Sequence, residues 1–240
     1  MKNFILLYIL LAATYLSADD FFKTTYTFKN VSVNYLDWTS KTEKNTSHKD
    51  FTYLELEGGA GFSWGEFYMF FDIENPTKSW NDEASQSLHL VFKPVLNINL
   101  IENLSLHIQD YNFHSKEFYV SNLITGIAYK INTDFGLWIK PFIGTHYQSS
   151  TYFSGFNGYM AGWTLLYNFD IKQQKFSISQ WHEYTLNRKN NLHTGIQGAL
   201  AFLWHPVDDI ATGLQYRYAI HELGSEKYQD AFIYSLKYNF

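Results

Sequence analysis

The sequence predicts an all-β protein, a transmembrane antiparallel up-and-down β-barrel of twelve strands. The last segment, 229–240, alternates between apolar and mixed positions and ends on Phe240, as the closing strand of a bacterial outer-membrane barrel does. Aromatic residues make up 20% of the chain, which suits strands and membrane-interface girdles. Beyond the N-terminus, no run of about 18 apolar residues could form a spanning helix. Together these features favour strands as the spanning elements.

The N-terminus has the parts of a secretory signal peptide. Lys2 supplies a positive charge, 4–11 form a short apolar core, and small residues lead to Ala18, which an acidic pair follows. A transmembrane anchor is the alternative, but the apolar core is too short and no stop-transfer charges come after it. We therefore expect residues 1–18 to be a signal peptide and 19–240 to be an exported outer-membrane barrel.

Composition and charge argue against several classes of function. The chain has no cysteine, which excludes disulfides and thiolate metal sites. A net charge of −5 argues against a protein that coats nucleic acid. The nine histidines have no metal-ligand spacing. We therefore expect no metal, no cofactor and no nucleic-acid binding.

The first three predicted strands each have one apolar face. In 28–38, Val33 and Tyr35 share a face, and 51–62 sets leucines against a tyrosine and glutamates. Segment 66–74 sets apolar residues against acidic and aromatic ones. Because successive side chains of a strand point to opposite faces, one face suits lipid and the other a polar lumen. The expected connections are a polar loop at 39–50, a tight turn at 63–65 and a loop at 75–85.

The middle strands follow the same pattern. Leu90 and Phe92 oppose His89 and Lys93, whereas the sixth segment alternates less cleanly. The predicted strands four to eight are 86–98, 104–113, 117–131, 136–147 and 159–169, with turns at 101–103 and 132–134 and loops at 114–116 and 148–157.

The last four strands complete an even number. In the eleventh, Leu214 and Tyr216 oppose Gln215 and Arg217. Five short turns and six longer loops then connect the strands, as expected for a chain with both ends in the periplasm. The predicted strands nine to twelve are 176–184, 193–204, 211–220 and 229–240, with turns at 172–174 and 205–209 and loops at 187–191 and 221–228.

Several of these segments resemble the nucleoside-specific channel-forming (Tsx-like) outer-membrane family. The segment 52–57, Thr-Tyr-Leu-Glu-Leu-Glu, followed by the Phe-Tyr hairpin at 66–72 is the most telling part. The correspondence is collinear over essentially the whole mature chain. Further matching stretches are Ser32-Val33-Asn34, Gly155–Tyr159, Arg217-Tyr218 and Tyr238-Asn239-Phe240.

The resemblance implies a twelve-stranded channel for passive uptake of small hydrophilic solutes, above all nucleosides. Its implied surroundings are the lipid bilayer with lipopolysaccharide. The implied assembly partner is the barrel assembly machinery, which would act on the C-terminal strand ending in Phe240.

Strand parity predicts which residues face the lumen. Aromatic rings there could stack on a planar base, worth roughly 1–3 kcal/mol per base, while charged groups bind sugar hydroxyls. The alternative is that the inward charges pair with one another and fill the lumen. The candidate solute-binding residues are Tyr53, Glu55, Glu57, Tyr68, Phe70, Asp72, Lys93, Trp138, Lys140, Phe142 and Arg217, and His89, His146, Trp181, Glu183 and Lys237 share their face.

Two further classes of function are weighed against a channel. A closed barrel could act as an adhesin or structural surface protein, but the modest loop lengths argue against it. A barrel lipase or deacylase would place a serine two residues after a histidine, and no histidine of this chain has one. For a barrel protease, Asp110 with His114 and Asp72 with Glu74 give only weak candidates. We therefore expect no enzyme and assign no catalytic residue.

Overall fold

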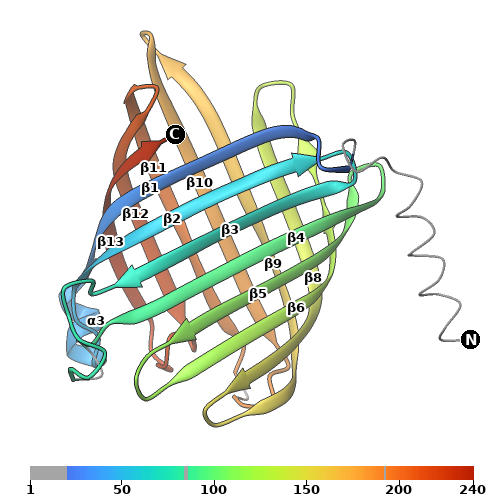
Figure 1. Ribbon diagram of the computed structural model, residues 1–240. Coiled ribbons are helices and arrows are strands. Elements are labelled where there is room, and N and C mark those ends of the chain that lie inside the picture. The colour runs from blue at the N-terminus through green and yellow to red at the C-terminus, as the bar shows by residue number, and fades with distance from the viewer. Residues whose placement is uncertain (1–20, 84–85, 192) are drawn as a thin grey trace, which may run out of the picture.

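The computed structural model describes residues 21–83, 86–191 and 193–240, which form one closed antiparallel barrel of twelve spanning strands (Figure 1). The barrel closes because β1 pairs with β13, in a register that sets Val33 opposite Leu236, and β6 pairs with β8. Closure leaves no open sheet edge, as a wall in lipid requires. The predicted fold is confirmed, while the predicted signal peptide, 1–18, lies outside the described residues.

Each spanning strand pairs with its neighbours in chain order, and β13 returns to β1. The elements are β1 (Thr24–Trp38), α3 (Ser40–Asn45), β2 (Phe51–Phe62), β3 (Gly65–Glu74), β4 (His89–Ile101), β5 (Leu104–His114), β6 (Tyr119–Tyr129), β7 (Ile131–Asn132), β8 (Leu137–Ser150), β9 (Ser154–Ile171), β10 (Gln174–Leu186), β11 (Gly195–Val207), β12 (Ile210–Ile220) and β13 (Gln229–Asn239).

Several predicted boundaries are wrong by a few residues. The largest error is the predicted loop 148–157: β8 runs on to Ser150 and β9 begins at Ser154, because this hairpin continues past a register shift. The predicted strand 117–131 corresponds to β6, which ends at Tyr129, and its last residue, Ile131, begins the two-residue β7. Position-by-position alternation cannot detect such irregular pairings, because it assumes an unbroken period of two.

The predicted polar loop 39–50 contains a short helix, α3. Thr39 caps its N-terminus, and the Thr39 hydroxyl accepts a hydrogen bond from the backbone N–H of Thr42. The Thr39 and Thr42 hydroxyls also donate to Asp230 Oδ1 at 2.6 and 3.1 Å, which ties the helix to β13. No helix within the described part of the chain is long and apolar enough to cross a membrane.

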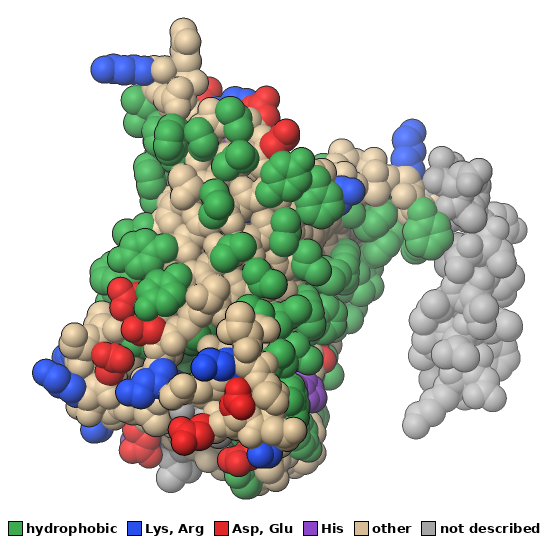
Figure 2. Space-filling view, turned by 60° about the vertical axis from the view of Figure 1, so that its left-hand side comes forward, with side chains coloured by type: hydrophobic (Ala, Val, Ile, Leu, Met, Phe, Trp, Pro, Cys, Tyr) green, Lys and Arg blue, Asp and Glu red, His purple; other side chains and the backbone are tan. Residues whose placement is uncertain are grey.

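The two ends of the barrel differ. The loop end carries α3 and the longer connections, and the opposite, turn end carries the tight connections (Figure 1). Charged side chains gather at the loop end, while hydrophobic side chains cover the wall (Figure 2). At the turn end the outward rings of Phe169, Phe176 and Phe202 stack in sequence, with centroids 5.7 and 5.5 Å apart. This surface suits a hydrocarbon band with an aromatic girdle.

Candidate functional site

The register places all the sequence-predicted lumen residues on the inward face of the barrel. Glu55 lies opposite Asp72 and Glu57 opposite Phe70 in the β2–β3 pair. In β8, Lys140 is 6% exposed, whereas outward Ile143 is 52% exposed. Small shifts at strand ends do not change this result, because the faces depend only on the alternation.

A carboxylate cluster lies on the wall formed by β1, β2, β3 and β13. Lys237 Nζ lies 2.6 Å from Glu57 Oε2 and 3.8 Å from Glu55 Oε1. Glu57 also accepts hydrogen bonds from the Tyr68 hydroxyl at 2.9 Å and from Asn30 Nδ2 at 3.0 Å. One cation and several neutral donors thus hold two neighbouring carboxylates in a low-polarity wall.

A second group of contacts crosses the lumen. Lys93 on β4 donates to Glu183 Oε1 on β10 at 2.8 Å, and Gln109 on β5 donates to the same oxygen at 2.9 Å. Gln197 on β11 donates to Glu183 Oε2 at 2.9 Å. Lys93 Nζ also lies 5.7 Å from the centroid of the Trp181 ring. Since β4 and β10 lie on opposite sides of the closed sheet, Glu183 links the two walls.

A third bridge lies nearer the turn end. Lys140 on β8 contacts Glu66 on β3, and Lys130 Nζ lies 3.5 Å from the same carboxylate. Asn97 Nδ2 donates to Glu66 at 3.3 Å, and Lys140 Nζ lies 5.0 Å from the centroid of the Trp138 ring. The expectation that inward charges pair across the lumen therefore holds for these lysines.

Arg217 and Asp72 differ from these pairs. Within the described ranges, Arg217 makes no ion pair, and its Nε is buried without a hydrogen-bond partner. Asp72 is 9% exposed, and its Oδ1 is buried without a partner as well. Arg217 is nonetheless close enough to interact electrostatically with Asp72, Tyr53 and Tyr111. Buried polar groups normally have partners, so this donor and this acceptor require an explanation.

Two apolar clusters fill other parts of the interior. Leu36, Trp38 and Ile233 lie in the cluster toward the loop end. The second cluster includes Phe142, whose ring stacks on His107 with centroids 4.5 Å apart. One face of Phe142 is therefore already occupied, which reduces its suitability as the stacking residue that the sequence predicts.

Sequence reasoning missed several residues of the lumen contacts. Gln109 and Tyr111 have the parity opposite to the outward residues of β5, so a complete parity reading would have found both. Glu66 lies on the inward face of β3 but was not among the candidates. The inward apolar residues Leu36 and Trp38 escape any reading that assigns only polar residues to the lumen.

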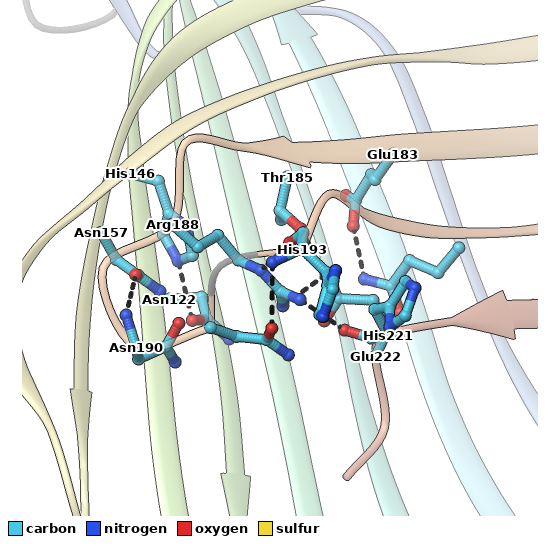
Figure 3. Close-up of polar contacts among 12 residues, drawn as sticks. Asn122, His146, Asn157, Glu183, Thr185, Arg188, Asn190, His193, His221 and Glu222 are labelled. Atoms are coloured by element: carbon cyan, nitrogen blue, oxygen red, sulfur yellow. Dashed lines mark hydrogen bonds and ion pairs between the residues drawn. The ribbon is translucent and has the colours of Figure 1, made fainter. Parts of the chain in front are cut away.

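A polar network covers part of the loop end (Figure 3). Arg188, in the β10–β11 loop, lies 3.1 Å from Glu222 Oε1 and donates to the backbone carbonyls of His193 and His221 at 3.1 and 2.6 Å. Thr185 donates to Glu222 at 2.5 Å. Burial raises the pKa of Glu222, although Arg188 opposes that shift. The network fastens the β10–β11 loop to the β12–β13 loop.

The same network reaches β9 through Asn157, which is fully buried. Asn157 Oδ1 accepts from the backbone N–H groups of Lys189 and Asn190 at 2.8 and 3.1 Å, and its Nδ2 donates to Gln148 at 2.6 Å. His146 Nε2 hydrogen bonds Asn122 Oδ1 at 2.8 Å nearby (Figure 3). The β10–β11 loop is thus held at both sides.

On the other side of the loop end, His48 stacks on Trp38 with centroids 4.4 Å apart and hydrogen bonds Gln229. Burial lowers the pKa of His48. The neutral imidazole is therefore the form that packs against Trp38. This contact adds to those of α3 in holding the β1–β2 loop over the barrel.

Replacing Arg188 by Ala is expected to loosen the two loops that it joins. The change leaves Glu222 without its cation and frees two carbonyls, and hydrogen bonds to charged groups contribute about 1.5–3 kcal/mol. Hydrogen exchange of the amides in the β10–β11 and β12–β13 loops should then accelerate about ten- to a hundredfold. Lys189→Ala removes an exposed neighbouring cation and is the matched control. Equal exchange in the two variants would contradict the assigned role.

The chain's sequence matches the family described as "Nucleoside-specific channel-forming protein, Tsx" over residues 33–240. Among solved structures, one described as "NanC porin structure in rhombohedral crystal form" has a TM-score of 0.51 at 10% identity, covering 87% of this chain and 98% of that chain. A "Bacterial polysaccharide outer membrane secretin" has a TM-score of 0.41 at 7% identity, covering 88% and 98%.

A third structure, OccAB3 of Acinetobacter baumannii, has a TM-score of 0.31 at 8% identity, covering 89% and 99%. The likeness to the NanC porin supports the barrel fold, and the family match spans most of the described barrel. The chain is an outer-membrane channel and belongs to the Tsx family of nucleoside-specific channel-forming proteins.

Proposed function

We propose that nucleosides are the solutes that diffuse through this channel, and that they bind at Arg217 and Asp72. The observation that carries the proposal is that Arg217, half-buried on the inward face, has no carboxylate partner within the described residues, whereas Lys93, Lys140 and Lys237 have theirs. A nucleoside base offers carbonyl and ring-nitrogen acceptors to a guanidinium, and its ribose offers hydroxyl donors to a carboxylate. The solute would therefore supply the partners that these two side chains lack.

The aromatic residues would supply the non-polar part of the interaction. Tyr53 and Tyr68 lie on the same β2–β3 wall as Asp72, and the Tyr68 and Phe70 centroids are 6.4 Å apart. Each base stacked on a ring contributes roughly 1–3 kcal/mol, which permits both capture and release. Trp138 would act in the same way near the turn end, whereas Phe142, buried in its cluster and stacked on His107, would act only through a rearrangement of that cluster.

The remaining predicted residues would shape the passage rather than bind the base. Glu55 and Glu57 share Lys237, while Lys93 and Lys140 bridge the lumen. Because both bridges cross the interior, a solute would have to displace them or pass beside them. Charged walls of balanced sign favour neutral solutes, and nucleosides are neutral.

We also propose export and assembly steps. Residues 1–18 would direct export and be removed, leaving 19–240 as the mature barrel. The barrel assembly machinery would act on β13 and the terminal Phe240, and the outer rim would contact lipopolysaccharide. We propose no catalytic residue and no cofactor for this protein.

The proposal is tested by single-channel recording from the purified barrel in planar bilayers. Adenosine and uridine are expected to interrupt the current at lower concentrations than a sugar of similar size does. Current that no nucleoside affects would leave the channel but contradict nucleoside binding. A barrel that gives no current would contradict passage itself and favour a surface role for the loops.

A further inference from the structure

A polar cavity of about 370 Å³ lies at the turn end, between the ends of β1 to β8. Its volume lies within the range of about 300–1,000 Å³ that small-molecule sites occupy. Glu66 and Lys140, which bridge the lumen, are among its lining residues. The cavity is thus a vestibule, on the turn side of the bridge and separate from Arg217 and Asp72.

The vestibule wall is rich in carboxamides. Asn97 is already engaged, because its side chain donates to Glu66 and hydrogen bonds His107 at 2.8 Å. In contrast, the exposed side chains of Asn103 and Asn132 make no hydrogen bond with the described part of the chain, and Asn99 makes only a long one, at 3.4 Å. Each free carboxamide offers donors and an acceptor, which is what hydroxyl groups require.

An aromatic ring lines the β1 side of the vestibule, and the charges of its lining balance. Tyr26 lies on the inward face opposite Gly61, where an added Cβ would clash with its ring, and the Tyr26 hydroxyl donates to Glu66 Oε2 at 3.2 Å. The ionised lining residues are two of each sign, Glu66 and Glu102 with Lys130 and Lys140. A site without net charge favours neither a phosphate nor a cation.

We propose that this vestibule binds an uncharged polyhydroxylated ring, such as a free pentose or the ribose of a nucleoside. The ring's apolar face would lie against the Tyr26 ring, and its hydroxyls would hydrogen bond Asn99, Asn132 and Glu66. The inference rests on the proposed function only in the choice of nucleosides as one source of the ribose. It gives the channel a second binding site, at its turn end.

Calorimetric titration of the purified barrel with D-ribose tests the proposal. Ribose is expected to bind the unaltered protein, and Asn99→Leu/Asn132→Leu should raise the Kd about tenfold or more, since two hydrogen bonds are lost. Both side chains are exposed, so the fold should tolerate the change. Asn168→Leu, at an exposed position of β9 outside the vestibule, is the matched control and should leave the Kd unchanged.

Further measurements distinguish free ribose from nucleosides as the ligand, and the vestibule from the proposed site at Arg217 and Asp72. Adenosine should lose vestibule binding in Asn99→Leu/Asn132→Leu, and 2′,3′-dideoxyadenosine should lack it even in the unaltered protein. Ribose binding is measured without any nucleoside, so a failure of nucleoside block would leave the result of this titration standing. Absence of ribose binding, or an equal Kd in the vestibule variant and Asn168→Leu, would overturn the proposal.

Discussion

Replacing Glu183 by Ala is expected to lower the free energy of unfolding of the barrel by about 3–5 kcal/mol. Glu183 accepts from Lys93, Gln109 and Gln197, and its side chain is only 7% exposed. Removing it leaves a buried ammonium and two carboxamides without their acceptor. A buried charge without its partner costs more than the pair contributes, because desolvation is no longer offset.

The measurement is urea unfolding of the barrel refolded into lipid vesicles, which gives the midpoint of the transition and the dependence of the free energy of unfolding on urea concentration. Lys93→Met/Glu183→Leu removes both charges and should recover most of the loss, since an apolar pair of similar volume avoids the desolvation cost. Asp208→Ala, which removes a turn carboxylate that is 82% exposed, should leave the midpoint in place. A loss in the double variant as large as in Glu183→Ala would mean that side-chain volume, not charge, is what matters at this position.

Replacing Arg217 by Ala is expected to weaken nucleoside block about ten- to a hundredfold. The Arg217 guanidinium makes no ion pair within the described ranges, so a solute bound to it would lose hydrogen bonds to a charged group when it is removed. Such bonds contribute about 1.5–3 kcal/mol. The measurement is the nucleoside concentration that blocks half of the single-channel current.

Two variants show whether the effect is specific. Arg217→Lys keeps the charge but not the planar group of donors, so it should restore block only in part. Asp72→Asn keeps the shape but weakens the acceptor for ribose hydroxyls, so it should weaken adenosine block more than 2′,3′-dideoxyadenosine block. Unchanged block in Arg217→Ala would remove Arg217 from the proposed binding site while leaving the channel itself intact.

The secondary structure could be predicted from local patterns. The alternation of β13, the aromatic positions and the turn residues are each recognised from residues only a few positions apart. They can therefore be identified directly from the sequence. The errors fall where local pattern and pairing differ. The β8–β9 hairpin shifts its register beyond Thr145. Helix α3 forms because Thr39 caps it and because Asp230, distant in sequence, accepts hydrogen bonds from its threonine hydroxyls.

The lumen could be predicted only in part. Parity identified Lys93, Glu183, Asp72 and Arg217 as inward, because facing is a property of each strand alone. Parity could not show which of these side chains contact one another. Lys93 and Glu183 are 90 residues apart in sequence, and they touch because the barrel's curvature and strand stagger bring β4 and β10 to opposite positions across a narrow interior.

The local alternation of residues is enough to identify a twelve-stranded membrane barrel and the side chains that point inward, because a strand repeats every two residues. Which of those side chains pair depends on the closed barrel, in which Lys93 and Lys140 form cross-lumen pairs while Arg217 and Asp72 do not. The closed barrel also forms the vestibule at the turn end. Those outcomes depend on distances across a closed barrel, which no local period encodes.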